Sequence, residues 1–163
     1  MRPGPSSESP IAHQRILDYA VTRTSSRCAH DFMVAVTQIV AVVDDDESVR
    51  RALMRLLRSV GVKADAFASG EAFLDSLSSA TSCVPVCVIT DLELPGIDGL
   101  ELQRRMIPMG VPIILISGND DPAVRGKALA QGAAGCLSKP FNGDELIWAV
   151  QMIIGLPQKA IQP

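Results

Sequence analysis

Long apolar runs are absent from this 163-residue chain. No run approaches the ~20 residues that a membrane-spanning helix needs. The first residues also do not contain the short apolar stretch that is typical of a secretory signal. We therefore expect a cytoplasmic protein that makes no membrane contact.

The chain also lacks an excess of basic residues and a metal-binding pattern of cysteines. Its formal net charge is −3, and its basic residues are scattered, which argues against a surface for direct DNA binding. The cysteines, whose spacing fits no metal site, are Cys28, Cys83, Cys87 and Cys136. Two of them lie in apolar segments, so we interpret all four as reduced structural residues.

The composition supports one folded domain with short extensions. Hydrophobic residues make up 47% of the chain and charged residues 20%, as in folded proteins, and the length suits one domain plus a tail. We expect residues 1–36 to be a disordered or weakly helical extension, residues 37–155 to form the domain, and residues 156–163 to be a tail. Because Met33 leads directly into the first strand, it is a candidate for the true start of the protein.

Apolar runs alternate with segments of helical periodicity. The β-branched run at residues 39–43 is typical of a strand buried on both faces, and apolar residues then recur at helical spacing up to Val60, before Gly61. Further strands are expected at 63–67, 86–90, 112–116 and 135–137, and further helices at 69–77, 100–106, 123–131 and 144–154. This pattern predicts a doubly wound α/β fold, with a five-stranded parallel sheet in the flavodoxin-like order 2-1-3-4-5 and five helices.

Polar residues stand where the predicted strands end. In an open α/β sheet, the ligand site lies beyond the carboxyl ends of the strands. The residues at those ends are Asp44, Asp45, Asp46, Asp91, Ser117 and Lys139. Carboxylates held this close repel one another, which a divalent cation such as Mg²⁺ relieves. An aspartate beside a lysine and a hydroxyl can attack phosphorus and form an acyl phosphate.

Each of these residues also has an ordinary interpretation. The acids at residues 44–47 could stabilise the start of the next helix through its dipole, and Asp91 could be a turn former before Pro95. Lys139 could be a solvated loop residue, and Ser117 could belong to a turn. The coincidence of four such features at one sheet edge is what favours a phosphoryl-transfer site.

Four segments closely resemble the receiver domains of response regulators in two-component signalling, with the nearest likeness to FixJ-type regulators. They are residues 42–47 (VVDDDE), 90–99 (TDLELPGIDG), 116–118 (ISG) and 138–141 (SKPF). Four motifs in this order and at this spacing are a specific signal. The resemblance implies a CheY-like fold. Because no segment of helix-turn-helix length follows residue 155, we expect a stand-alone receiver with no DNA-binding output domain in this chain.

The resemblance implies a role for each acid. Asp91 would accept a phosphoryl group from a phosphohistidine on a sensor histidine kinase or phosphotransfer protein. The direct Mg²⁺ ligands would be Asp45, Asp91 and the backbone carbonyl of Glu93. Asp44 would act through a water molecule. The chain would not be an enzyme in the usual sense, since it would catalyse only its own phosphorylation and dephosphorylation.

The resemblance also implies how the phosphoryl group is held and sensed. Lys139 would hold one phosphoryl oxygen after a cis bond to Pro140, and Ser117 would bind another and pull its loop inward. Cys136 stands where receivers usually have a Tyr or Phe that swings inward. The signal would therefore depend on the loop after Ser117 and its adjoining helix, and it would pass to a downstream protein or a homodimer partner. Trp148 could be an exposed anchor for that contact or a core residue.

Two other functions fit part of the pattern. A haloacid-dehalogenase-like phosphatase also uses a nucleophilic aspartate with Mg²⁺, and Asp44 and Asp46 have the spacing of its acid pair. The chain is small, however, and has no cap insertion. A degenerate receiver that acts only as a binding module would agree with Cys136, but the acids, the hydroxyl and the lysine are intact.

Overall fold

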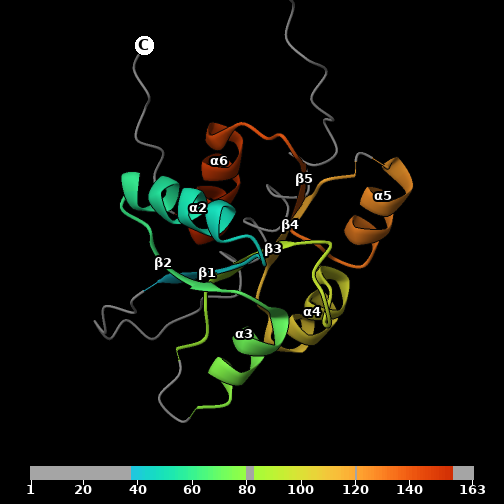
Figure 1. Ribbon diagram of the computed structural model, residues 1–163, viewed down its shortest axis with the longest axis horizontal. Coiled ribbons are helices and arrows are strands. Elements are labelled where there is room, and N and C mark those ends of the chain that lie inside the picture. The colour runs from blue at the N-terminus through green and yellow to red at the C-terminus, as the bar shows by residue number, and fades with distance from the viewer. Residues whose placement is uncertain (1–37, 80–82, 120, 156–163) are drawn as a thin grey trace, which may run out of the picture.

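The computed structural model describes residues 38–79, 83–119 and 121–155. In them, five parallel strands form one sheet in the order β2-β1-β3-β4-β5 (Figure 1). The strands are β1 (Ile39–Val43), β2 (Lys63–Phe67), β3 (Cys87–Asp91), β4 (Ile113–Ser117) and β5 (Gly135–Ser138). The predicted fold class and strand order are confirmed.

Five α-helices follow the strands in alternation. They are α2 (Glu47–Ser59), α3 (Gly70–Leu77), α4 (Gly99–Met106), α5 (Pro122–Ala130) and α6 (Gly143–Ile154), with a short 3₁₀ turn at Ile107–Met109 after α4. The predicted elements are all present, and their ends differ by a residue or two. Pro112, for example, precedes β4 because it has no N–H, although its carbonyl still accepts a hydrogen bond from Val88 N at 2.9 Å.

Helices cover both faces of the sheet. Helices α2 and α6 pack on one face and α3, α4 and α5 on the other, and each side has its own core cluster (Figure 1). Strands β3 and β4 are buried along their whole length, as their β-branched sequences predict. Trp148 is half-buried against the core on the α2 and α6 side, so the structure favours its interpretation as a core residue.

Side chains cap every helix start among these five. The N-cap residues are Asp46, Ser69, Asp98, Asp121 and Asn142, and each accepts a hydrogen bond from a backbone N–H in the first turn of its helix. Such caps contribute about 1 kcal/mol each. At the other end of α2, Gly61 has a φ of 77° and donates to the carbonyl of Arg58, as expected of a terminating glycine.

Several predictions from the sequence concern residues that the structure does not describe. These are the extension over residues 1–36, the alternative start at Met33, the tail over 156–163 and the state of Cys28. In the described part of the chain, no helix has the length and apolar character to cross a membrane.

Gly99 lies against the backbone that carries the predicted phosphoacceptor. A Cβ at Gly99 would approach the Asp91 carbonyl oxygen to 2.6 Å and the Cα of Leu92 to 2.9 Å, both in the backbone. We therefore expect Gly99→Ala to lower the free energy of unfolding by roughly 1–3 kcal/mol, the usual cost of overpacking.

The matched control is Gly126→Ala in α5, where a Cβ would meet no atom within 4 Å. Alanine is the better helix former, so this change should raise the free energy of unfolding by up to about 1 kcal/mol. Urea unfolding followed by circular dichroism measures both variants. Equal effects of the two changes would contradict the tight packing at Gly99.

Candidate functional site

The predicted site residues gather where the parallel strands end. The carboxyl ends of β1, β3, β4 and β5 carry, in this order, Asp44, Asp91, Ser117 and Lys139. One carboxylate oxygen from each of Asp44, Asp45 and Asp91 lies within 4.8 Å of the other two. The sequence prediction that these acids meet at one sheet edge is confirmed.

Lys139 supplies the positive charge that faces these acids. Its Nζ lies 3.0 Å from Asp91 Oδ2 and 3.6 Å from Asp44 Oδ2. Its backbone N donates to the Ser117 carbonyl at 2.7 Å, which fixes the chain beside β4, and its bond to Pro140 is cis, as expected. Lys139 is thus an ion-pair partner in the site, and the interpretation as a solvated loop lysine is wrong.

The lysine is held in its charged form. Burial on its own would lower the pKa of Lys139, but the hydrogen bond to Asp91 and the charges of Asp44 and Asp91 outweigh it, and the pKa is raised. An ammonium group therefore faces the acids at neutral pH.

Asp44 is the most deeply buried acid of the cluster. Its side chain is 1% exposed, and its Oδ1 accepts a hydrogen bond from Asp46 N at 2.8 Å. Oδ2 has no hydrogen-bond partner within the residues that the structure describes. Burial raises the pKa of Asp44, and the charges of Asp91 and Asp45 raise it further, against the opposing effects of the Asp46 N–H and Lys139.

Both oxygens of Asp91 are oriented by hydrogen bonds. The residue is 8% exposed, Oδ1 accepts from Glu93 N at 3.0 Å, and Oδ2 accepts from Lys139. The backbone just after it is fixed by the hydrogen bond from Leu92 N to the Ile116 carbonyl at 2.7 Å. A carboxylate that is held in this way and still reaches the surface is well placed to act as a nucleophile.

Glu93 takes no part in the carboxylate cluster. Its side chain is exposed and is not one of the three acids that come together. This agrees with a role through its backbone carbonyl alone, and that role stays a prediction.

The Ser117 hydroxyl is engaged in a local turn. Ser117 is 4% exposed, its Oγ donates to the Asn119 carbonyl at 2.9 Å, and it accepts from Asn119 N at 3.1 Å. The turn interpretation is therefore correct for this conformation. A hydroxyl has one hydrogen to donate, and here that hydrogen is used by the Asn119 carbonyl.

Cys136 fills an apolar position in the core beneath α5. It is 2% exposed, and burial raises the pKa of its thiol, against the lowering effect of nearby Arg125. Cys83, Cys87 and Cys136 form no disulfide, as expected of reduced residues. Cys87 and Cys136 are buried, whereas Cys83 is exposed.

Two functional side chains were missed in the sequence. Arg50 in α2 donates from Nη1 to the carbonyls of Asp44 at 2.7 Å and Asp45 at 3.0 Å, which fixes the acidic loop. Its position one helical turn after the Asp46 cap was the signal that could have revealed it. Glu71 binds a backbone N–H that lies 26 residues away in the sequence, and no local pattern could have predicted this contact.

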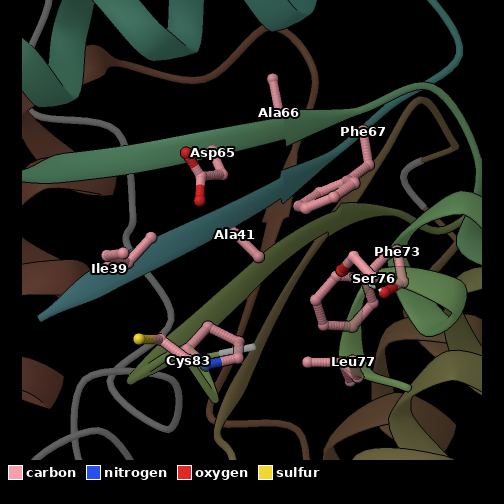
Figure 2. Close-up of a pocket in the computed structure, with 10 residues that line it drawn as sticks. Ile39, Ala41, Asp65, Ala66, Phe67, Phe73, Ser76, Leu77 and Cys83 are labelled. Atoms are coloured by element: carbon pink, nitrogen blue, oxygen red, sulfur yellow. Dashed lines mark hydrogen bonds between the residues drawn. The ribbon is translucent and has the colours of Figure 1, made fainter. Parts of the chain in front are cut away.

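A cavity lies away from these acids. It has a volume of about 540 Å³ between β1, β2 and α3, and its wall includes the edge-to-face pair Phe67 and Phe73, whose ring centroids are 5.3 Å apart (Figure 2). None of the predicted site residues lines it. The acids lie instead at the carboxyl ends of the strands, where Asp44 and Asp91 are buried and Asp45 is exposed.

The donor set suits a hard divalent cation. The cluster offers only carboxylate oxygens. The buried Oδ2 of Asp44 accepts no hydrogen bond among the described residues and has only the longer ion pair with Lys139, so a further positive charge would stabilise it. Mg²⁺ binds one or two carboxylates with water and phosphate oxygens, which matches a shallow acidic cluster of this kind. The residues present therefore fit the predicted metal.

Comparisons with known proteins agree with this geometry. A family model described as "Response regulator receiver domain" matches residues 40–151. The response regulator protein TmoT of Ectopseudomonas mendocina is 36% identical over 124 residues, which cover 74% of this chain and 55% of TmoT. The transcriptional regulatory protein FixJ of Azorhizobium caulinodans is 37% identical over 121 residues, which cover 71% of this chain and 54% of FixJ. The chain thus spans about half the length of these relatives.

A solved structure extends the likeness to the whole described fold. The crystal structure of a response regulator receiver protein from Burkholderia phymatum is similar with a TM-score of 0.69 and 49% sequence identity, over 75% of this chain and 98% of that one. Fold, motif residues and family model agree. The chain belongs to the receiver-domain family of two-component response regulators.

Proposed function

We propose that Asp91 accepts a phosphoryl group in a Mg²⁺-dependent reaction, from a phosphohistidine on a sensor histidine kinase or phosphotransfer protein. The observation that carries this proposal is the contact of 3.0 Å between Lys139 Nζ and Asp91 Oδ2, beside the buried Asp44. A fixed cation and a second acid beside a carboxylate that is 8% exposed support the proposal. Family membership supports the same function.

The metal ligands are proposed from the cluster and from the family pattern. Asp45, Asp91 and the backbone carbonyl of Glu93 would hold Mg²⁺ directly, and Asp44 would do so through water. When bound, Mg²⁺ supplies positive charge that offsets the repulsion among carboxylates and phosphate oxygens. Arg50 keeps the acidic loop in place through its two bonds to backbone carbonyls.

Phosphoryl transfer changes the partner of Lys139. An oxygen of Asp91 forms the new bond to phosphorus as the phosphorus–nitrogen bond of the donor breaks, and the imidazole leaves with the electron pair. The product is an acyl phosphate, so the negative charge that faced Lys139 moves to the phosphoryl oxygens. The ammonium group can follow it over a short distance and stabilise the product.

The signal passes through the loop after β4. The Ser117 hydroxyl would exchange the hydrogen bond that it donates to the Asn119 carbonyl for one to a phosphoryl oxygen, and this would draw the loop and the start of α5 inward. Because Cys136 is smaller than a Tyr or Phe, the surface change would come from this loop and not from an aromatic side chain. The output would be contact with a downstream protein or a second copy, made by a cytoplasmic domain that spans residues 37–155.

The phosphatase alternative requires Asp46 as a second acid beside Asp44, and Asp46 has another role. The carboxylate of Asp46 accepts hydrogen bonds from Ser48 N at 2.7 Å and Val49 N at 3.4 Å, as the N-cap of α2. It is therefore occupied by the helix and does not accompany Asp44 in the cluster. A single phosphoryl group per cycle, followed by slow self-catalysed loss, is the behaviour we propose.

Asp91→Asn tests the acceptor. Incubation with Mg²⁺ and acetyl phosphate should add one phosphoryl group to the wild-type chain, as measured by intact mass, because the carboxylate is the nucleophile. The variant should gain none. Asp65→Asn, which changes an exposed aspartate in β2, is the control and should be phosphorylated normally. Phosphorylation of the Asp91→Asn variant, or of the wild type in excess EDTA, would contradict the proposal.

Asp44→Asn tests how much the buried, ionised carboxylate of Asp44 lowers the free energy of unfolding. Since the pKa of Asp44 is raised in the folded state, the ionised carboxylate disfavours folding at pH 7, and the penalty disappears as the pH falls below the ordinary value of 3.8. In EDTA at pH 7, the variant should be more stable than the wild type by on the order of 1 kcal/mol.

Added Mg²⁺ should reverse the order, since it stabilises the state that binds it. Urea unfolding with and without Mg²⁺, at pH 7 and below pH 3.8, measures these differences. A variant less stable than the wild type in EDTA would show that Lys139 outweighs the burial of Asp44.

A further inference from the structure

The loop between β3 and α4 carries the proposed Glu93 ligand. Its base is fixed twice, by the hydrogen bond from Leu92 N to Ile116 O at 2.7 Å and by the one from Gly99 N to Leu92 O at 3.1 Å. Leu92 and Leu94 are buried in the core beneath it. For the far part of the loop, the described residues include no backbone hydrogen bond to β4, and a side chain supplies a contact there instead.

That contact comes from the start of α3. Glu71 Oε1 accepts a hydrogen bond from Ile97 N at 2.8 Å. The helix also approaches the loop closely at Gly70, where a Cβ would meet the Ile97 carbonyl oxygen at 2.9 Å. Gly96, with a φ of 77°, turns the chain directly beside the Glu71 carboxylate. The tip of the loop is therefore fitted to this one side chain.

The charge state of Glu71 suits this role. Its pKa is lowered by a hydrogen bond from its own backbone N–H and then by the one from Ile97 N–H. The carboxylate is therefore ionised at neutral pH, and a hydrogen bond to an ionised acceptor is stronger than one between neutral groups. The neighbouring N-terminus of α3 favours the same negative charge.

We propose that Glu71 is a positioning residue, which holds the loop from β3 to α4 so that the Glu93 carbonyl is ready to bind Mg²⁺. This inference rests on the proposed function. Glu93 lies between two fixed points, since its own N–H donates to Asp91 Oδ1 and the tip beyond it is held at Ile97. Fixing both ends lowers the entropy that the loop loses when its carbonyl becomes a ligand.

Three substitutions at Glu71 separate the effect of side-chain length from the effect of the negative charge. Glu71→Gln keeps an oxygen at the right distance but removes the charge. Glu71→Asp keeps the charge but is too short to reach Ile97 N, and Glu71→Ala removes both. Asp75→Ala, which removes another exposed acid of α3, is the matched control.

The first measurement is the Mg²⁺ dissociation constant of the unphosphorylated full chain, by calorimetric titration with Mg²⁺ alone. Glu71→Ala and Glu71→Asp should raise it several-fold, up to ~10-fold, as expected for loss of a group that orients a ligand. Asp75→Ala should stay close to the wild type. Glu71→Gln should lie between the wild type and Glu71→Ala, because its neutral oxygen keeps the hydrogen bond in a weaker form. Amide hydrogen exchange at Ile97 should be fastest in Glu71→Ala and Glu71→Asp.

The outcomes distinguish this inference from the proposed function. If the wild type binds no Mg²⁺, both are overturned. If the wild type binds Mg²⁺ and the Glu71→Asp and Glu71→Ala variants bind it equally well, the role of Glu71 is overturned and the proposed function stands. A loss in Glu71→Gln equal to that in Glu71→Ala would also overturn it, because charge and not reach would then set the affinity.

Discussion

Mutual repulsion among carboxylates at the end of the sheet is the constraint on which this structure depends. The strand order places Asp44 and Asp91 next to each other, and the burial of Asp44 prevents water from screening the repulsion between them. Lys139 offsets only part of this charge, because it lies closer to Asp91 than to Asp44. A folded domain with such a site is less stable than it could be, and in the proposed function a bound cation would recover the deficit.

The rest of the fold compensates for this local cost. Strands β3 and β4 are wholly buried, and two apolar clusters hold the helices on both faces. Each helix start has a capping side chain, and Asp46 uses one acid of the first loop for that purpose. The acids that remain in the site are thus the ones that helix formation does not need.

Local sequence patterns predicted the fold well because each helix and strand is determined largely by residues close together in the sequence. The β-branched run of β1, the apolar spacing of α2 and the position of Gly61 each depend on nearby residues, and their order leads to the sheet by chain connectivity alone. The acids of the site followed from the same rule, since parallel strands end at one edge. The ends of elements moved by a residue or two, as at Pro112, where a missing N–H decided the boundary.

Contacts between residues far apart in the sequence could not be predicted from local patterns. The pairing of Glu71 with Ile97 N joins helix α3 to a loop that only the finished sheet brings beside it, and either residue alone resembles an ordinary surface position. The engagement of the Ser117 hydroxyl with Asn119 is a choice between two partners, which composition cannot decide. Likewise, Trp148 had two equal interpretations until the packing of α6 placed it against the core.

The engaged hydroxyl of Ser117 has a consequence for how such a domain communicates. In the proposed mechanism, a hydrogen bond to Asn119 would be replaced and not simply added to, so a ligand that prefers the rearranged loop would shift the populations of the two arrangements. Linkage would then work in both directions: a protein that binds only the rearranged loop would make phosphorylation of Asp91 more favourable by the same factor by which phosphorylation would tighten its own binding. The downstream protein would therefore also help to set the fraction of the domain that stays phosphorylated.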